Sequence, residues 1–166
     1  RIATFTTSGA GSSYDNNIKA TTLHVNETST FGGALDATTL NVNFASTFGG
    51  AVTATTANVD AVSTFSSTLD ATTLNVNFAS TFGGAVTATT TANVKAASTF
   101  SSTLDTTTLN VEAASTFDGA VTATTKIEVK ANSTFSDVVT SPTFNVATGK
   151  TATEKGKMNI YSGTIT

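Results

Sequence analysis

A Ser-Thr-Phe tripeptide recurs along this chain, with steps of 17 or 18 residues between its phenylalanines. A fixed period of this length is typical of stacked or wound β architectures, in which each repeat is one structural unit that cannot bury its apolar face alone. The repeat therefore indicates a function that depends on length, surface and assembly, and it argues against catalysis. The repeated phenylalanines are Phe31, Phe48, Phe65, Phe82, Phe100, Phe117 and Phe135.

Two further apolar positions repeat in step with the phenylalanine. We predict that these two columns and the phenylalanines form the core, because they are the apolar residues that keep the period. Six residues before each Phe stand Val25, Val42, Val59, Val76, Val94, Val111 and Val129. Four residues after each Phe stand Leu35, Val52, Leu69, Val86, Leu104, Val121 and Val139.

The residues that precede each tripeptide alternate between apolar and small or polar types. Leu40, Val42 and Phe44 alternate with asparagine and alanine. This period of two is that of a half-buried strand. It predicts that Phe44 lies on the same buried face as Leu40 and Val42.

Two corners are predicted within each unit. Turn-forming residues follow every Phe, as in Gly49–Gly50 or Ser66–Ser67. The two longer steps place their extra residue within 89–92 and 124–127, which marks a second corner because insertions are tolerated there and not inside paired strands. A unit then divides into three short sides: 40–42, 46–48 and 51–54.

These patterns predict an all-β fold, a repetitive parallel β-solenoid with about 17 residues per unit. An interwound trimeric β-fibre is the alternative, since the apolar columns could also meet across chains. One unit advances about 4.8 Å along the axis in the solenoid and roughly 10 to 15 Å in the interwound fibre. We expect an irregular lead-in at 1–13, an array of about eight units at 14–146, and a degenerate unit or a connection to missing sequence at 147–166. We also expect the ends to be covered by other chains or by further sequence.

The composition limits the kinds of partner that the chain is expected to bind. Only 11% of the 166 residues are charged and the net charge is -3, so no basic patch is expected to bind nucleic acid. No apolar run reaches the length of a spanning helix, so membrane insertion is not expected. A surface of Thr, Ser and Asn with few charges suits a virion surface or an extracellular location.

One polar column stands out between the inward-facing residues. His24, the only histidine, occupies this column, so we interpret it as outward and solvated and not as a catalytic group or metal ligand. Identical amides one coil apart can form a hydrogen-bonded ladder, although solvated amides on a strand face explain the column equally well. The asparagines of the possible ladder are Asn41, Asn58, Asn75, Asn93, Asn110 and Asn145.

Two other polar patterns have both a binding and a structural interpretation. Asp36, Asp70 and Asp105 recur every second unit and are interpreted as solvated corner acids rather than as calcium ligands. Thr-x-Thr trios such as Thr53–Thr55 are typical of ice-binding solenoids, but ordinary β propensity also explains threonine here. No catalytic residue, cofactor or metal site is predicted.

The unit at 39–52, Thr-Leu-Asn-Val-Asn-Phe-Ala-Ser-Thr-Phe-Gly-Gly-Ala-Val, resembles the repetitive shafts of phage tail fibres and of fibre-like proteins in viruses of aquatic microbes. The resemblance implies an elongated β-helical rod on a virion, commonly trimeric, that holds a host-recognition tip away from the particle. The chain is also similar to the bactofilin core, a single-chain β-helix that polymerises end to end. Bactofilins are usually cytoplasmic and richer in charge, which this chain is not.

The predicted function is that of a non-enzymatic structural shaft segment of a virion that self-assembles and presents or spaces a host-attachment element. An extracellular adhesin, an ice-binding solenoid and a bactofilin-like filament are the alternatives. The expected partners are further copies of the chain, with a trimer favoured over end-to-end assembly, other virion proteins, and a host receptor or glycan.

Overall fold

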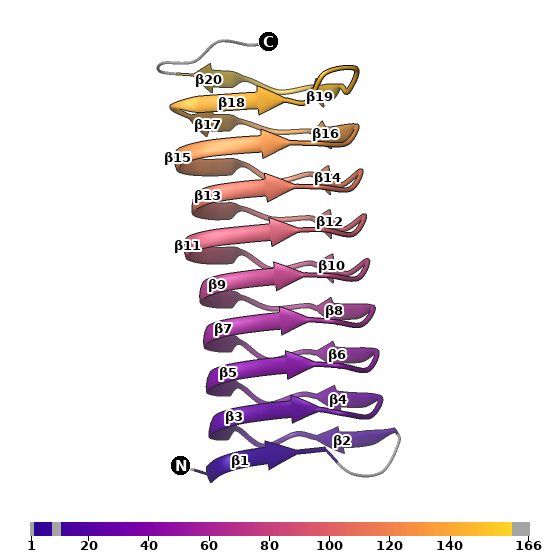
Figure 1. Ribbon diagram of the computed structural model, residues 1–166. Coiled ribbons are helices and arrows are strands. Elements are labelled where there is room, and N and C mark those ends of the chain that lie inside the picture. Colours follow the sequence, from indigo (N-terminus) through magenta and orange to yellow (C-terminus); the bar gives the residue numbers. More distant parts are fainter. Residues whose placement is uncertain (1, 8–10, 161–166) are drawn as a thin grey trace.

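A computed structural model describes residues 2–7 and 11–160. Over these residues the chain forms strands and no helix. It winds into a single elongated β-solenoid of about nine turns, with successive turns about 17 residues apart (Figure 1). The predicted fold class is confirmed, and the chain coils on itself instead of interwinding with others.

Long and short strands alternate along the chain. The long strands are β1 (Ile2–Thr6), β3 (Ile18–Val25), β5 (Leu35–Val42), β7 (Val52–Val59), β9 (Leu69–Val76), β11 (Val86–Val94), β13 (Leu104–Val111) and β15 (Val121–Val129). The short strands are β2 (Ser12–Tyr14), β4 (Ser29–Phe31), β6 (Ser46–Phe48), β8 (Ser63–Phe65), β10 (Thr81–Phe82), β12 (Thr99–Phe100), β14 (Thr116–Phe117) and β16 (Ser133–Phe135). The last coils contain β17 (Val139–Ser141), β18 (Thr143–Val146), β19 (Ala152–Glu154) and β20 (Met158–Ile160).

All described strands pair in parallel, and each pairs with its counterparts one coil away. The long strands and their C-terminal continuations form an 11-stranded sheet, and the short strands form a 9-stranded sheet. The register keeps like residues together, so that Val42 lies opposite Val59 and Phe48 opposite Phe65. Segment 1–13 adds β1 and part of β2 to the sheets, and segment 147–166 adds β19 and β20.

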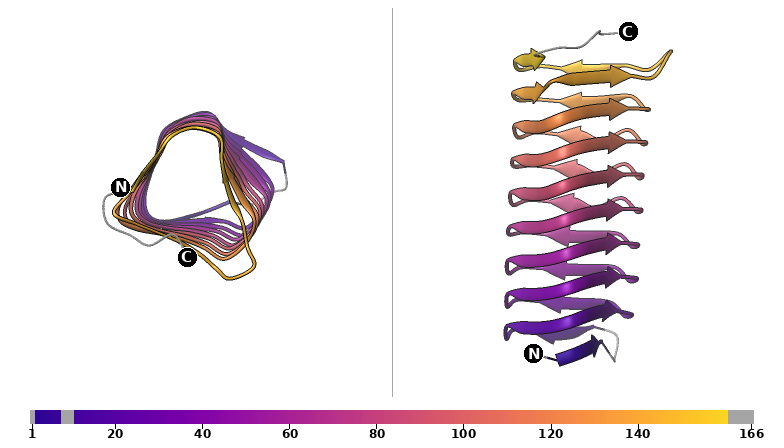
Figure 2. Two further views of the ribbon diagram at one scale, coloured as in Figure 1. Left: turned by 90° about the horizontal axis from the view of Figure 1, so that it is seen from above. Right: turned by 60° about the vertical axis from the view of Figure 1, so that its left-hand side comes forward.

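Seen along its axis, the solenoid has a rounded triangular outline (Figure 2). Each long strand bends at its middle and so covers two sides, and each short strand lies on the third (Figures 1 and 2). The burial pattern along β5 reflects this bend, because Leu35 and Ala37 are buried before it, Leu40 and Val42 after it, and Thr38 is exposed between them. Residues 40–42 form the second half of β5 and residues 46–48 form β6, so they lie on two different sides of the triangle, as predicted.

The extra residues of the two longer units fall at the bend of the long strands. The pairing of β11 with both neighbours shifts register between Ala88 and Thr91, and the pairing of β13 with β15 shifts at the corresponding place. Pro142 occupies the same bend in the last coils and separates β17 from β18. Proline lacks an N–H and is best tolerated where no ladder hydrogen bond is needed. The predicted second corner is thus confirmed.

The corner after each Phe is a place of close backbone approach. A Cβ added to Gly84 would collide with the backbone carbonyl of Ser67 in the preceding coil. Glycine at this position therefore lets neighbouring coils stay in contact at the turn. The turn residues predicted from the sequence do lie between the short and long strands.

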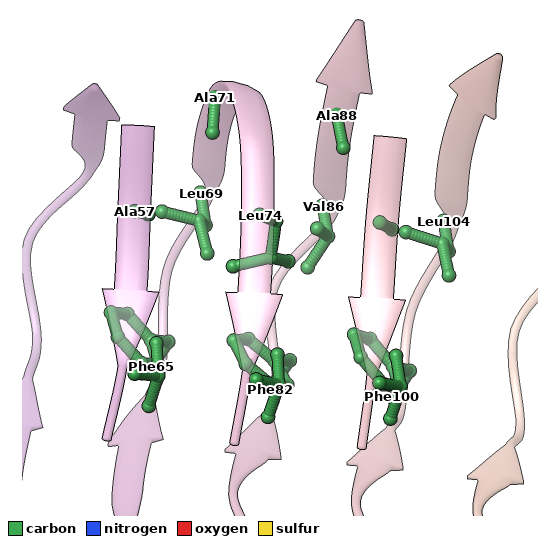
Figure 3. Packing of buried hydrophobic residues seen from close by; sticks show 14 of the residues in the cluster. Ala57, Phe65, Leu69, Ala71, Leu74, Phe82, Val86, Ala88, Phe100 and Leu104 are labelled. Carbon is green, nitrogen blue, oxygen red and sulfur yellow. The ribbon is translucent and has the colours of Figure 1, made fainter. Parts of the chain in front are cut away.

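The core is a set of buried columns that extend from Leu23 to Phe144. Figure 3 shows several of these columns in the coils between Ala57 and Leu104. From Phe31 to Phe135 the rings stack with centroids 4.5 to 5.1 Å apart and interplanar angles of 3 to 10°. Aromatic pairs at such distances add stability beyond the area that they bury. The two predicted aliphatic columns are buried beside the rings. A further buried column, which the sequence analysis did not count, contains Leu23, Leu40, Ala57, Leu74, Ala92, Leu109 and Ile127.

The prediction for Phe44 is wrong. Strand β5 ends at Val42, and the chain turns before β6 begins at Ser46. The alternation of inward and outward side chains holds only within a strand. Phe44 therefore points outward with 51% of its surface exposed, and Phe78 in the equivalent turn is 53% exposed.

Candidate functional site

A row of asparagine amides runs along the outer face of the long strands. Each Nδ2 donates to the Oδ1 of the asparagine one coil earlier, over 2.8 to 2.9 Å. The bonded residues are Asn41, Asn58, Asn75, Asn93 and Asn110. All four bonds point the same way, so the amides form a continuous ladder parallel to the axis.

The ladder ends at a residue of different type on each side. His24 Nδ1 lies 3.3 Å from Asn41 Nδ2 and accepts from it, since the amide nitrogen can only donate. At the other end Glu128 lies opposite Asn110, and Asn145 lies opposite Glu128. The register therefore places Asn145 beyond a carboxylate, apart from the bonded amides. His24 is half-buried and terminates the ladder.

A buried serine column is the main feature that the sequence analysis missed. The serine of each tripeptide faces inward at the start of a short strand, where most members both accept and donate a hydrogen bond. For example, Ser80 Oγ donates to the Phe78 carbonyl at 3.1 Å and accepts from the Ser63 N–H at 3.2 Å. This serine closes the turn and links coils, so it is a structural group and not a nucleophile. The column is Ser29, Ser46, Ser63, Ser80, Ser98, Ser115 and Ser133.

The aspartates of alternate coils do not converge. Asp36 forms an ion pair with Lys19 at 2.6 Å, and the side chains of Lys19 and Asp36 are 64% and 45% exposed. Asp70 pairs in register with Thr53 and Thr87, so the next acid lies two coils away, at about 9.6 Å. Calcium takes six to eight oxygen ligands at 2.3 to 2.6 Å, and the register places threonines, not further acids, on both sides of Asp70. Within 2–7 and 11–160 no group of three or more His, Cys, Asp or Glu residues could hold a metal ion.

Threonine covers two parts of the outer surface. The Thr-x-Thr trios alternate with coils that carry aspartate, so they form an interrupted array with an open hollow of about 340 Å³ beside Asp105. The outer face of the short strands carries an unbroken row with one threonine per coil. This row is Thr30, Thr47, Thr64, Thr81, Thr99, Thr116 and Thr134.

A second hollow, of about 440 Å³, lies at the N-terminal end and is lined by Phe5, Tyr14 and the loop at 15–17. Ser13 Oγ donates there to Asp15 Oδ1 at 3.1 Å. The single histidine of the chain, His24, contacts Asn41 in the amide ladder through Nδ1 and does not line this hollow. This hollow offers polar and aromatic surface.

No helix long and apolar enough to cross a membrane occurs in the described part of the chain. In comparisons with known proteins, no family model matches the chain, and no curated protein or solved structure matches it. The functional argument therefore depends on the geometry of the rod and its outer faces.

Proposed function

We propose that this chain is a non-enzymatic shaft segment of a fibre on a virion surface, where it spaces or presents a host-attachment element. The observation that carries the proposal is the continuity of the columns from coil to coil. Stacked phenylalanines, bonded serines and bonded amides all run parallel to the axis. Each addition of a unit lengthens the rod without changing its cross-section, which is what a spacer requires.

The surface supports an exposed location. Of the 166 residues only 11% are charged, and the outer faces carry threonine and asparagine instead. Such a surface offers no electrostatic attraction to nucleic acid. Proposed partners are further copies of the chain, other fibre or virion proteins, and a receptor or glycan bound by an element that the shaft carries.

The spacer function can be tested by changing the number of units. A second copy of residues 35–68, which is two units, inserted after residue 68 should lengthen the rod by about 9.6 Å. Small-angle X-ray scattering would show a longer maximum dimension at an unchanged cross-sectional radius. A longer chain that keeps its maximum dimension would refute the spacer proposal.

The location can be tested with antibodies raised against the chain. Immunogold electron microscopy should label projections on virus particles produced by the source organism. Labelling of filaments inside cells would support the bactofilin-like alternative instead. Specific binding of the bare shaft on a glycan array would favour an adhesin whose binding surface is the rod itself.

The unbroken threonine row favours one second candidate, an ice-binding surface. Regularly spaced hydroxyl and methyl groups lie along one flat strand face, from Thr30 to Thr134. Thermal hysteresis of the purified chain, abolished by changing Thr64 and Thr81 to tyrosine, would support this candidate. The same freezing point and melting point in the presence of the chain would eliminate it.

A further inference from the structure

One corner of the solenoid is apolar along most of its length. The turns that join each long strand to the next short strand form a row at the right-hand edge of Figure 1. Of the twelve residues at the two positions before each tripeptide serine in six successive coils, all but Asn132 are Ala, Val or Phe. We call this row the turn ridge; it consists of 44–45, 61–62, 78–79, 96–97, 113–114 and 131–132. Every residue of the ridge is exposed or half-buried.

The turn ridge has a bulky half and a small half. Phe44, Val62 and Phe78 project from three successive coils with 51 to 58% of their surfaces exposed. The next three coils present only alanine and Asn132 at the same positions. The other two corners are richer in glycine, serine and threonine and include charged residues such as Asp118 and Lys126. An exposed apolar row of this length on a polar rod marks an interaction surface.

The residues that flank the ridge divide in the same way. Beside the bulky half stand Asn43, Asp60 and Asn77, with a net charge of -1. Beside the small half stand Lys95, Glu112 and Lys130, with a net charge of +1. Lys130 and Glu112 pair with each other at 3.6 Å.

We propose that two copies of this chain pair side by side and antiparallel through the turn ridge. In this arrangement the coil of Phe44 faces the coil of Ala131 in the other copy, and the coil of Phe78 faces that of Ala97. Bulky side chains then meet small ones, and the half with net charge -1 meets the half with net charge +1. A parallel, in-register pair would place Phe44 of one copy against Phe44 of the other. It would also place each half of the ridge against a half with the same net charge.

The proposed partner is a second copy because its contacting side chains must repeat along the axis at the same spacing as the coils of the turn ridge. The ridge spans five steps of about 4.8 Å, or about 24 Å, and another solenoid of the same repeat presents contacts at the same spacing. A two-fold axis perpendicular to the rods, between the coils of Phe78 and Ala97, makes every contact occur twice. The contact is narrow, so it belongs to the weak class of interfaces. The pairing does not depend on the proposed place in a virion, because it would bundle rods in any setting.

The first test measures self-association. Sedimentation equilibrium from about 10 µM to about 1 mM, the range suited to a weak interface, should show the mass rising from 16.7 kDa toward twice that value. The double variant Phe44→Asp, Phe78→Asp should weaken the dimer at least tenfold. A matched control, Thr47→Asp with Thr81→Asp, adds the same charges in the same coils on another exposed face. Circular dichroism should show the same fold in all three proteins.

A monomer over the whole range, or a dimer that the phenylalanine variants leave intact, would overturn the proposal. Such a result would leave the spacer function untouched, because the length and immunogold experiments do not depend on pairing. Conversely, a ridge-dependent dimer would stand even if the chain proved not to be a virion component.

The second test determines the orientation. The chain has no cysteine, so an introduced cysteine is the only thiol in each variant and any disulfide must involve it. Mixed Ala45→Cys and Asn132→Cys proteins should form a disulfide-linked heterodimer under mild oxidation, because these positions face each other in the antiparallel pair. Ala45→Cys alone should stay uncrosslinked, since its two copies would lie about five coils apart. Efficient crosslinking of Ala45→Cys with itself would show a parallel pair and refute the proposed orientation.

Discussion

The central coils and the last coils of the solenoid keep the same strand register but fill it with different side chains. In the centre, Phe65 and Phe82 stack face to face with an interplanar angle of 7°. At the C-terminal end, Phe135 lies opposite Glu154, and its ring meets Phe144 at 73°. The amide ladder also stops before this region, at Asn110. Strand pairing therefore continues where the stacked rings and the bonded amides have ended.

The difference indicates that backbone pairing sets the architecture, and we expect the side-chain columns to add stability to it. Glu154 Oε1 is buried without a hydrogen-bond partner at the place where the phenylalanine column would continue. An unpaired buried polar group costs free energy that a stacked ring does not. The last coils should therefore open more readily than the centre.

The largest effect is expected from placing a charge inside the central stack. Phe82→Asp should destabilise the protein by several kcal/mol, because the carboxylate would lie between two rings without a partner. Thr81→Asp is the matched control, since Thr81 is the exposed neighbour in the same short strand. Urea unfolding followed by circular dichroism measures both. Similar free energies of unfolding for the two variants would refute the inward and outward assignment.

A smaller loss is expected from interrupting the amide ladder. Asn75→Ala removes the donor to Asn58 Oδ1 and leaves that acceptor without its partner, which should cost about 1 to 2 kcal/mol. Asn145→Ala in the last coils should cost almost nothing, because Asn145 lies beyond the bonded row. The same urea experiment compares the two. An equally mild effect at both positions would mean that the ladder adds no stability.

The last coils should gain stability if the phenylalanine column is extended. Glu154→Phe removes the unpaired carboxylate and offers a ring to Phe135, which should stabilise the C-terminal end by about 1 kcal/mol. Hydrogen exchange measured by mass spectrometry should slow in β16 and β19 and stay unchanged in β7 to β11. Faster exchange in β19 would show that the backbone there cannot hold a stacked ring.

The smallest change is expected at the N-terminal end of the ladder. His24→Asn would continue the amide row by one residue and replace a 3.3 Å contact with an amide hydrogen bond, a gain of about 0.5 kcal/mol. Differential unfolding in urea against the unchanged protein can resolve this value. A loss of stability would indicate that the ring packs against its neighbours in a way an amide cannot replace.

The repeat period predicted most of the fold because the inward columns are apolar in every unit. The two 18-residue steps located a corner correctly, since an insertion inside a paired strand would have broken the register seen at Val86 and Val94. Phe44 was misplaced because alternation alone does not show where a strand ends. The Leu40 column was not counted as a column, since alanine replaces the larger aliphatic residue in two of its seven members, Ala57 and Ala92.

The buried serines could not be recognised from composition. Serine is usually exposed, and burial of Ser80 is favourable only because a turn carbonyl and the preceding coil both bond to its hydroxyl. The amide ladder was one of two equal interpretations, because spacing places asparagines side by side but does not orient their amides. The turn ridge became visible only when Phe44, Val62 and Phe78 were found to project from neighbouring coils.

The most direct test of the account is the rise per unit along the axis. Spin labels on Thr30→Cys and Thr116→Cys would lie on the outer face of the short strands, five coils apart in the register. Pulsed electron paramagnetic resonance should give a distance of about 24 Å if each unit makes one coil. A distance of roughly 50 to 75 Å, the value for an interwound fibre with the same units, would contradict the single-chain solenoid.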